Sequence, residues 1–233
     1  MNIFYIPTPT GNTIVLPEEE SLHCVRVLRM KKGDEMELMD GNGLIYRARI
    51  THAHDKKCEA EILADPVVVP RRPFRIHVAI APPKSIDRFE WFLEKATEIG
   101  IDRITPVFCE HSERTVLKTE RLQKVLVSAM KQSQQAWLPL LDAPARWKDF
   151  ANAPHEADKF ICTCTAGNDL LLKKLYKPSH SVTILIGPEG DFSENEIQQA
   201  LTAGFKECSL GSSRLRTETA GVAACHTIHI LNS

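Results

Sequence analysis

Two short glycine turns near the C-terminus carry the residue types best suited to chemistry. The first, residues 187–190, reads Gly-Pro-Glu-Gly and follows the apolar run Thr183–Ile186. The second, residues 211–213, is followed closely by Arg216 and Glu218. Glycine turns leave backbone N–H and C=O groups open to a ligand. Charged side chains clustered at a strand end rarely serve a core, so the pattern predicts a ligand site.

The elements around these turns are typical of an α/β sheet. Thr183–Ile186 has the length and β-branched content of a buried strand. Ser193 and Glu196 have the spacing of a capping box, which starts the next helix. A short strand is expected over Glu207–Leu210 and a final helix over Thr217–Ile230. We expect the two strands to be neighbours, so that both turns face the edge where α/β sheets bind ligands.

The chain before this region predicts further alternation of strands and helices. Strands are expected over Phe74–Ile80, Arg103–Phe108 and Phe160–Thr163, and helices over Ser85–Ile99 and Lys118–Trp137. The first of these strands is followed by Ala-Pro-Pro-Lys rather than by a glycine-rich turn. This absence argues against a Rossmann-type dinucleotide-binding fold.

The N-terminal part predicts a separate β-rich domain. Its strands alternate with turn residues, and Pro17 opens one short helix. The proline-punctuated connector Asp65–Pro73 is the natural boundary. We therefore divide the chain into domains 1–69 and 70–233. The predicted strands of the first domain are Asn2–Ile6, Thr13–Leu16, Met36–Met39, Leu44–Thr51 and Cys58–Leu63.

Composition restricts the class of protein. The chain has 233 residues, 43% of them hydrophobic, which suffices for a sizeable core. The net charge of −1 means that any nucleic-acid surface must be a local patch. Seven cysteines without a C-x-x-C pair predict reduced thiols and no metal site. With neither a signal pattern nor a long apolar run, we expect a cytoplasmic protein without membrane segments.

Several segments resemble the RsmE group of SPOUT methyltransferases. GPEGDFSENE (187–196) and LGSSRLRTETA (210–220) are similar to two signatures of that family, and residues 84–113 are similar to a third. Residues 23–43 resemble its N-terminal PUA-like barrel. The resemblance implies an α/β trefoil-knot methyltransferase domain after a PUA-like domain. It also implies a homodimer that methylates N3 of a uridine in 16S ribosomal RNA, on the small ribosomal subunit, with S-adenosylmethionine as methyl donor.

The resemblance also implies roles for the residues of the turns. Arg216 is expected to stabilise the anion formed at the uracil ring or to orient the catalytic base, and Glu218 to remove the N3 proton or to fix Arg216 in place. The implied donor-binding residues are Thr165, Ile186, Gly187, Pro188, Glu189, Gly190, Leu210, Gly211, Ser212, Leu215, Arg216 and Thr217.

RNA contacts are expected from cations near helix ends, linkers and turns, because phosphate binding needs only positioned positive charge. The cationic candidates are Arg26, Arg29, Lys31, Lys32, Arg71, Arg72, Lys84, Arg114 and Arg214, and Gln134 is a further candidate that can supply hydrogen bonds but no charge. The chain departs from the family pattern at three places. Gln135 stands where an arginine is usual, Asp191 where a glycine is common, and Ser213-Arg214 where Arg-Ile is common.

Two other functions remain open from the sequence. A ribose 2′-O-methyltransferase of the same superfamily would need no base for a uridine N3 proton. A non-catalytic RNA-binding protein could keep the fold without binding the methyl donor.

Overall fold

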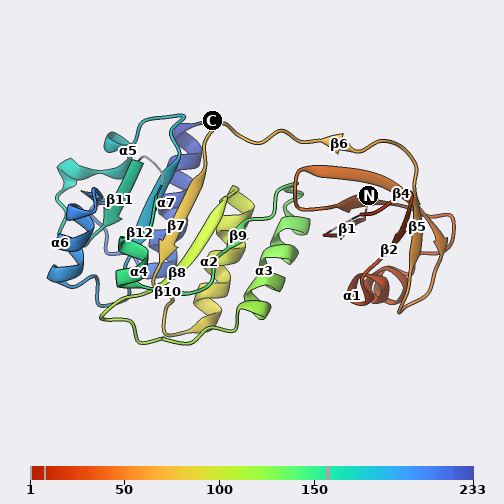
Figure 1. Ribbon diagram of the computed structural model, residues 1–233, viewed down its shortest axis with the longest axis horizontal. Coiled ribbons are helices and arrows are strands. Elements are labelled where there is room, and N and C mark those ends of the chain that lie inside the picture. Colours follow the sequence, from red (N-terminus) through yellow and green to blue (C-terminus); the bar gives the residue numbers. More distant parts are fainter. Residues whose placement is uncertain (1, 8, 156–157) are drawn as a thin grey trace. The chain divides into compact units, whose positions relative to one another are not determined.

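The computed structural model describes residues 2–7, 9–155 and 158–233 and forms two compact units (Figure 1). The first unit contains residues 1–71 and 130–138, and the second contains residues 72–129 and 139–233. The segment 130–138 therefore packs with the first unit, although it lies far from the rest of that unit in sequence.

The first unit is built on a mixed sheet with the order β1-β3-β4-β5-β2, and β6 pairs with β4. β1 runs parallel to β3, and the other pairs are antiparallel. Asp40 forms the β3–β4 turn, because its Oδ1 accepts hydrogen bonds from the backbone N–H groups of Asn42 and Leu44. The strands are β1 Ile3–Tyr5, β2 Thr13–Val15, β3 Glu35–Met39, β4 Leu44–His52, β5 Glu59–Ile62 and β6 Val67–Val68.

One short helical segment covers this sheet. It begins after Pro17 as α1 (Glu18–Leu22) and continues as the π-helix η1 (His23–Val27). Arg29 then adopts a left-handed backbone conformation, with φ of 55°. The predicted β-rich domain with one helix is thus confirmed, but the helix changes its winding halfway.

The second unit is organised around a parallel sheet with the order β10-β8-β7-β12-β11-β13, and β9 pairs with β8. Four strands end in register: Ile80 pairs with Ile186, Ile186 with Cys162, and Cys162 with Cys208. The strands are β7 Ile76–Ile80, β8 Arg103–Phe108, β9 Leu140–Leu141, β10 Ala145–Arg146, β11 Asp158–Cys162, β12 Val182–Ile186 and β13 Lys206–Cys208.

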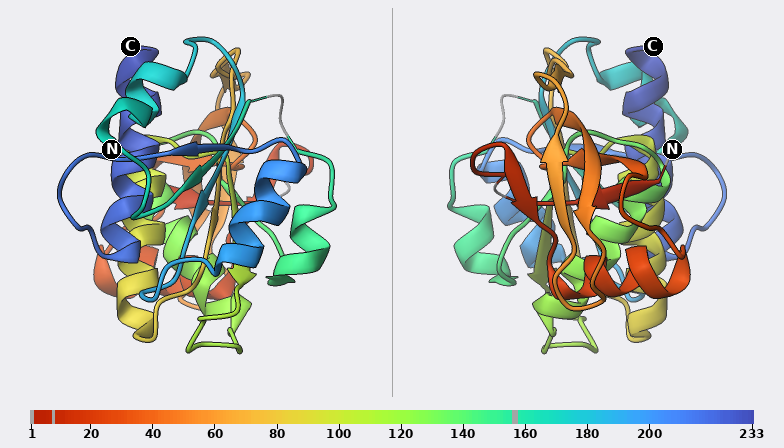
Figure 2. Two further views of the ribbon diagram at one scale, coloured as in Figure 1. Left: turned by 90° about the vertical axis from the view of Figure 1, so that its left-hand side faces the viewer. Right: turned by 90° about the vertical axis from the view of Figure 1, so that its right-hand side faces the viewer.

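Helices cover both faces of this sheet (Figure 2). One face is covered by α2 and α7, which pack so closely that no Cβ would fit at Gly221 beside Phe92. α4 and α6 cover the other face over a core that includes Trp147 and Phe205. The helices are α2 Ile86–Ile99, α3 Thr119–Gln132, α4 Trp147–Ala151, η2 Asn168–Leu170, α5 Leu172–Leu175, α6 Glu194–Thr202 and α7 Thr217–Leu231.

Two predictions about the second region were wrong in detail. β12 and β13 are not neighbours, because β11 lies between them. The helix expected to reach Trp137 ends at Gln132. The backbone then bonds to the β3–β4 turn instead of continuing the helix: Gly43 N–H donates to Ala136 O and Leu138 N–H to Gly41 O. These tertiary hydrogen bonds replace the helical ones that propensity alone would predict.

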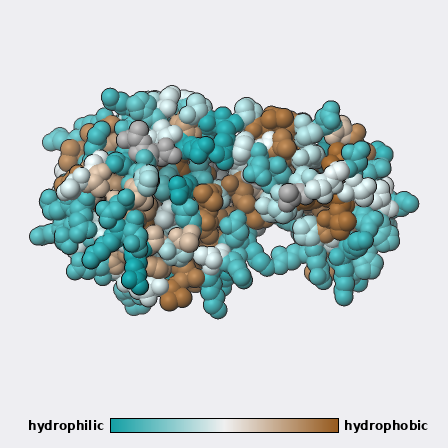
Figure 3. All heavy atoms as spheres, in the orientation of Figure 1, coloured by the Kyte–Doolittle hydropathy of each residue, from teal (hydrophilic) through white to brown (hydrophobic). Residues whose placement is uncertain are grey.

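The face drawn in Figure 3 is mostly hydrophilic, with groups of apolar residues between polar ones. Within the described chain, none of the helices combines the length and apolar character needed to cross a membrane.

Candidate active site

The loops after four parallel strands meet at one edge of the second unit. The strand ends Ile80, Cys162, Ile186 and Cys208 lie in one row, since neighbouring strands are in register there. The carboxyl edge of a parallel sheet is where open α/β folds bind ligands. Both glycine turns therefore face the same edge as predicted, even though β11 separates their strands.

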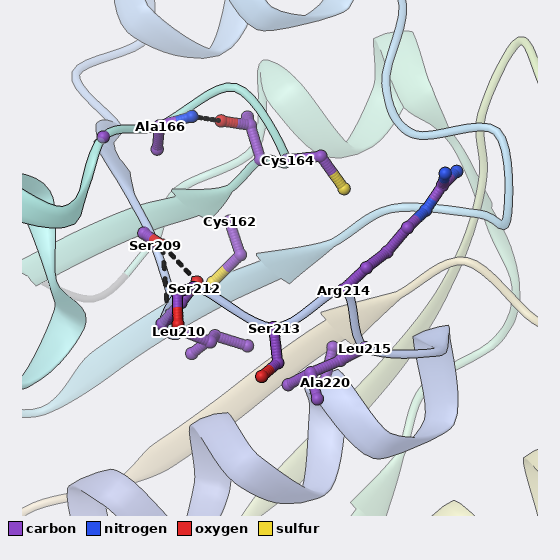
Figure 4. Close-up of a pocket in the computed structure, with 13 residues that line it drawn as sticks. Cys162, Cys164, Ala166, Ser209, Leu210, Ser212, Ser213, Arg214, Leu215 and Ala220 are labelled. Atoms are coloured by element: carbon purple, nitrogen blue, oxygen red, sulfur yellow. Dashed lines mark hydrogen bonds between the residues drawn. The ribbon is translucent and has the colours of Figure 1, made fainter.

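A pocket of about 610 Å³ lies at this edge (Figure 4). It lies between the loop after β11 and the loop after β13, and α7 contributes one residue. Its volume falls in the range of pockets that hold cofactors and other small molecules. The lining residues are Cys162, Thr163, Cys164, Ala166, Gly167, Ser209, Leu210, Gly211, Ser212, Ser213, Arg214, Leu215 and Ala220.

Hydrogen bonds within each loop hold the pocket walls. The Thr163 hydroxyl accepts from Ala166 N–H at 3.1 Å, and the Ser209 hydroxyl accepts from Gly211 N–H at 3.2 Å (Figure 4). Gly211 has φ of 133°, which only glycine adopts without strain. Gly167 and Gly211 leave the neighbouring space open, because a Cβ added at either would meet nothing within 4 Å.

The first glycine turn is tied to its neighbours by Asp191 and Thr217. Asp191 Oδ2 accepts a hydrogen bond from Cys164 N–H at 2.8 Å, which links the loop after β12 to the loop after β11. The Thr217 hydroxyl donates to Gly187 O at 3.0 Å, which links the same turn to the start of α7. Asp191 has φ of 62°, a left-handed conformation that glycine adopts without strain.

The pocket thiols are poor nucleophiles. The hydrogen bond to Cys208 and burial raise the pKa of Cys162 well above its usual value. Burial, together with the nearby Asp191 carboxylate, also raises the pKa of Cys164. Both side chains therefore remain protonated near neutral pH, and the pocket offers no thiolate for covalent catalysis.

A second pocket of about 600 Å³ shares Arg214 and Leu215 with the first. Its charged walls include both residues predicted to act in catalysis, Arg216 and Glu218. Glu218 lies in the first turn of α7, where the helix dipole favours a carboxylate. The complete lining is Asp87, Arg88, Trp91, Arg214, Leu215, Arg216, Glu218 and Thr219.

The cation nearest to Glu218 is Arg88 rather than Arg216. Arg88 Nε lies 3.9 Å from Glu218 Oε1, and Glu218 is only 7% exposed. Within residues 2–7, 9–155 and 158–233, Arg216 forms neither an ion pair nor a side-chain hydrogen bond. The structure therefore shows no direct ion pair between Glu218 and Arg216 among these residues, and the role of Glu218 toward Arg216 stays a prediction. Arg216 remains free to meet a ligand.

The predicted donor-binding residues fall into four groups. Leu210, Gly211, Ser212 and Leu215 line the 610 Å³ pocket. Arg216 and Leu215 line the neighbouring one. The residues 186–190 and Thr217 form the linked turn beside them, outside the pocket lining. Thr165 stands apart, because its hydroxyl bonds Thr163 and Glu207 at 3.3 Å each.

Two predicted RNA contacts, Lys84 and Arg114, lie at the same edge of the second unit. Lys84 N–H donates to Glu189 Oε1 at 3.1 Å, so it contacts the first glycine turn. Its ammonium group pairs with Glu113 at 2.7 Å, and this bond raises the pKa of Lys84. Arg114 Nε donates to Pro83 O at 3.1 Å and thereby braces the loop after β7.

The other predicted RNA contacts are divided between the units. Arg26 pairs with Asp55, whereas Arg29, Lys31 and Lys32 form no side-chain ion pair with any residue that the structure describes. Gln134 has φ of 57° in the turn after α3. In the first unit, Arg71 packs over the Trp137 ring at 4.3 Å.

Arg72 belongs to the second unit and has structural partners. It pairs with Asp102 at 2.8 Å, donates to Gly100 O, and lies over the Phe74 ring. These contacts hold its guanidinium group near the start of β7. Arg72 is therefore less available to RNA than a residue on a solvated linker would be.

Sequence reasoning missed three pocket residues on α2, namely Asp87, Arg88 and Trp91. Their only signal was their place in the segment 84–113, which resembles a family signature. The loop after β11 was expected, but Cys164, Ala166 and Gly167 line the pocket there rather than Thr165.

Comparison with known families defines the class of protein. Residues 70–229 match a family described as RNA methyltransferase domain, and residues 16–63 match one described as RNA methyltransferase PUA domain. The chain is thus an RNA methyltransferase with a PUA-like domain before a mixed α/β domain.

The chain belongs to the ribosomal RNA small subunit methyltransferase E family. It is 32% identical to the Synechocystis member over 230 residues, which cover 94% of this chain and 73% of that relative. The Aquifex aeolicus member is 27% identical, with 96% of each chain covered.

Two solved structures have the same fold. The Neisseria gonorrhoeae ribosomal RNA small subunit methyltransferase E, bound to S-adenosyl methionine, is 31% identical. Its TM-score is 0.86, and the match covers 100% of this chain and 98% of that one. A Porphyromonas gingivalis structure described as "probable rRNA-methyltransferase" is 41% identical, with a TM-score of 0.89 and the same coverage.

Proposed function

We propose that this enzyme transfers a methyl group from S-adenosylmethionine to N3 of a uridine in 16S ribosomal RNA. The observation that carries the proposal is the adjacency of two pockets that share Arg214 and Leu215. One has glycine-lined walls suited to a cofactor, and the other contains an arginine and a carboxylate suited to proton transfer. A methyl group passing between them would need little movement of either reactant.

The residues of the first pocket fit the methyl donor. The turns of residues 209–213 and 163–167 present backbone groups and small side chains to a cavity of about 610 Å³. Leu210 and Leu215 offer apolar surface, which suits an adenine ring. S-adenosylmethionine, when bound, supplies a methyl group on a sulfonium centre. The loops bind and orient that group, and the protonated thiols of Cys162 and Cys164 do not compete for it.

The second pocket provides the acid–base chemistry that the acceptor requires. N3 of uridine bears a proton and is a poor nucleophile until that proton is removed. Glu218 accepts the N3 proton, and Arg216 stabilises the negative charge that spreads to O2 and O4 of the ring. Arg88, 3.9 Å from Glu218, holds the carboxylate in place as a positioning residue.

The proposal extends to the partners that the sequence predicts. The substrate would be 16S RNA within the small ribosomal subunit, in the cytoplasm, and the active form would be a homodimer. The chain path around the donor-binding loops would form the trefoil knot implied by the family resemblance. The exposed cations Arg29, Lys31 and Lys32 would contact RNA phosphates, which need positioned charge but no sequence reading.

Analysis of ribosomal RNA tests this function directly. We would digest 16S RNA from cells with and without the gene and quantify N3-methyluridine by mass spectrometry. We expect that nucleoside to disappear without the gene, and to return with the wild-type protein but not with Arg216→Ala.

Other results would point to the alternatives. Loss of a ribose-methylated nucleoside would identify a 2′-O-methyltransferase instead. No change in any methylated nucleoside, together with no binding of S-adenosylmethionine by calorimetry, would indicate an RNA-binding protein without this activity.

A further inference from the structure

The three tryptophans of the chain differ in their environment. Trp147 is 6% exposed and donates its indole N–H to Gln199 at 2.8 Å. Trp137 donates to Val69 O at 3.1 Å and packs under Arg71. Trp91 is 42% exposed, and its indole N–H has no hydrogen-bond partner in the part of the chain that the structure describes. Trp91 is thus the tryptophan with a partly exposed ring and a free indole N–H, and both could contact a ligand.

Trp91 lies in the pocket that also contains the proposed catalytic residues. It comes from α2, whereas Arg216 and Glu218 come from the start of α7. The pocket of about 600 Å³ has no other aromatic residue in its lining. One flat apolar surface and a set of charged groups therefore line the same space, next to the first pocket.

We propose that Trp91 is the stacking surface for the target uracil, an inference that rests on the function proposed above. An enzyme that modifies a ring atom must hold the base outside a helical stack. An aromatic side chain replaces the lost base stacking, since every base has a π-face. Stacking on Trp91 would leave the ring edge, with N3, O2 and O4, available to Glu218 and Arg216.

The charges of the pocket fit a nucleotide better than an apolar partner. Arg88, Arg214 and Arg216 line the same space. Arg214 and Arg216 make no ion pair within the described residues, so both can meet a phosphate or an electron-rich ring. An apolar protein surface that docked here would remove water from these guanidinium groups without offering hydrogen bonds in exchange, which is unfavourable.

Three substitutions at Trp91 separate stacking from simple apolar contact. Trp91→Ala removes the surface, Trp91→Leu keeps an apolar side chain without a π-face, and Trp91→Phe keeps a smaller aromatic ring. Leu201→Ala is a matched control, because Leu201 is 38% exposed on α6, on the other face of the sheet.

The assay measures methyl transfer to small ribosomal subunits purified from cells that lack the gene. We expect kcat/KM for the RNA substrate to fall about 5- to 100-fold for the Ala and Leu variants. The Phe variant should keep most of the wild-type value, and Leu201→Ala all of it. Affinity for S-adenosylmethionine, measured by calorimetry, and the molar mass in light scattering should stay unchanged in every variant.

Three results would overturn the proposal. Equal activity of the Leu and Phe variants would show that apolar volume, not stacking, is what matters. An altered molar mass of the Ala variant would place Trp91 in a subunit interface. An unchanged kcat/KM for the Ala variant would remove Trp91 from substrate binding. By contrast, absence of methyl transfer by the wild-type protein would overturn the proposed function itself.

Discussion

Arg88 Nε lies 3.9 Å from Glu218 Oε1, across the contact between α2 and α7. The pair joins a half-exposed guanidinium group to a carboxylate that is almost fully buried. Because α2 and α7 are more than 100 residues apart in sequence, the pair depends on how these helices pack. It gives Glu218 a cationic neighbour that the sequence did not predict.

Replacing Arg88 should impair catalysis without preventing donor binding. We expect Arg88→Ala to lower kcat about 2- to 5-fold, since a partly solvated ion pair contributes modestly to the position of its carboxylate. Arg88→Lys should restore part of the rate. Single-turnover methyl transfer and calorimetry with S-adenosylmethionine measure the two effects. Equal rates for the wild type and the Ala variant would show that Glu218 needs no positioning by Arg88.

Asp191 should stabilise the protein through its hydrogen bond to the loop after β11. Asp191→Ala removes the acceptor of Cys164 N–H and leaves a side chain at φ of 62°, so we expect a loss of about 1–3 kcal/mol in unfolding free energy. Asp191→Gly loses the hydrogen bond but relieves the backbone conformation, and should cost less. Denaturant unfolding and donor calorimetry on both variants provide the measurement. A Gly variant less stable than the Ala variant would contradict this reasoning.

Gly221 should be required for the close packing of α7 on α2. A Cβ at Gly221 would lie 2.6 Å from Phe92 Cε2 and 3.0 Å from Ile80 Cδ1. Gly221→Ala should therefore destabilise the protein by about 1–3 kcal/mol, despite the better helix propensity of alanine. Gly167→Ala is the control, because it would meet nothing within 4 Å. A higher midpoint of thermal unfolding for the Gly221 variant would refute the packing argument.

His77 should make stability depend on acid pH. Burial, with the nearby Arg103, lowers the pKa of His77 to about 3, and its Nε2 lies 2.7 Å from Thr105 Oγ1. The unfolded chain binds that proton near its ordinary pKa of about 6.5, so the unfolded state takes up more protons between these values. The contribution of the buried, neutral His77 to the unfolding free energy is therefore fully present above about pH 6.5. It is lost as the pH falls toward 3.

A comparison of variants isolates the contribution of His77 to the pH dependence of the unfolding free energy. We expect the unfolding free energy of the wild type to fall more steeply between pH 7 and pH 4 than that of His77→Gln, which cannot titrate. His229→Gln serves as the control at a more exposed site, where burial also lowers the pKa of the imidazole. Parallel curves for the wild type and His77→Gln would contradict the assignment.

The features that sequence predicted correctly are local. Ser193 and Glu196 form the expected capping box, with Ser193 Oγ accepting from Glu196 N–H and Glu196 Oε2 accepting from Ser193 N–H. The strand before the first glycine turn is β12, and the final helix is α7. Each depends on residues within a few positions of one another, where propensity and side-chain bonds act together.

The features that sequence missed depend on distant segments. α3 ends before Trp137 because Ala136 and Leu138 bond the β3–β4 turn, nearly a hundred residues earlier. The strand β11 enters the sheet between β12 and β13, an order that no periodicity encodes. Trp91 and Arg88 were not predicted as site residues, because the residues that line the pocket with them come from the start of α7 and the loop before it.

The sequence by itself determined the alternation of strands and helices, the two glycine turns, and the presence of an arginine and a carboxylate at the start of the last helix. Only the tertiary structure decided that Cys164 donates a hydrogen bond to Asp191, that Glu218 pairs with Arg88, and that the two pockets adjoin. Local bonds follow from neighbouring residue types. Contacts between loops depend on strand order and helix packing, which the energy of the whole fold selects.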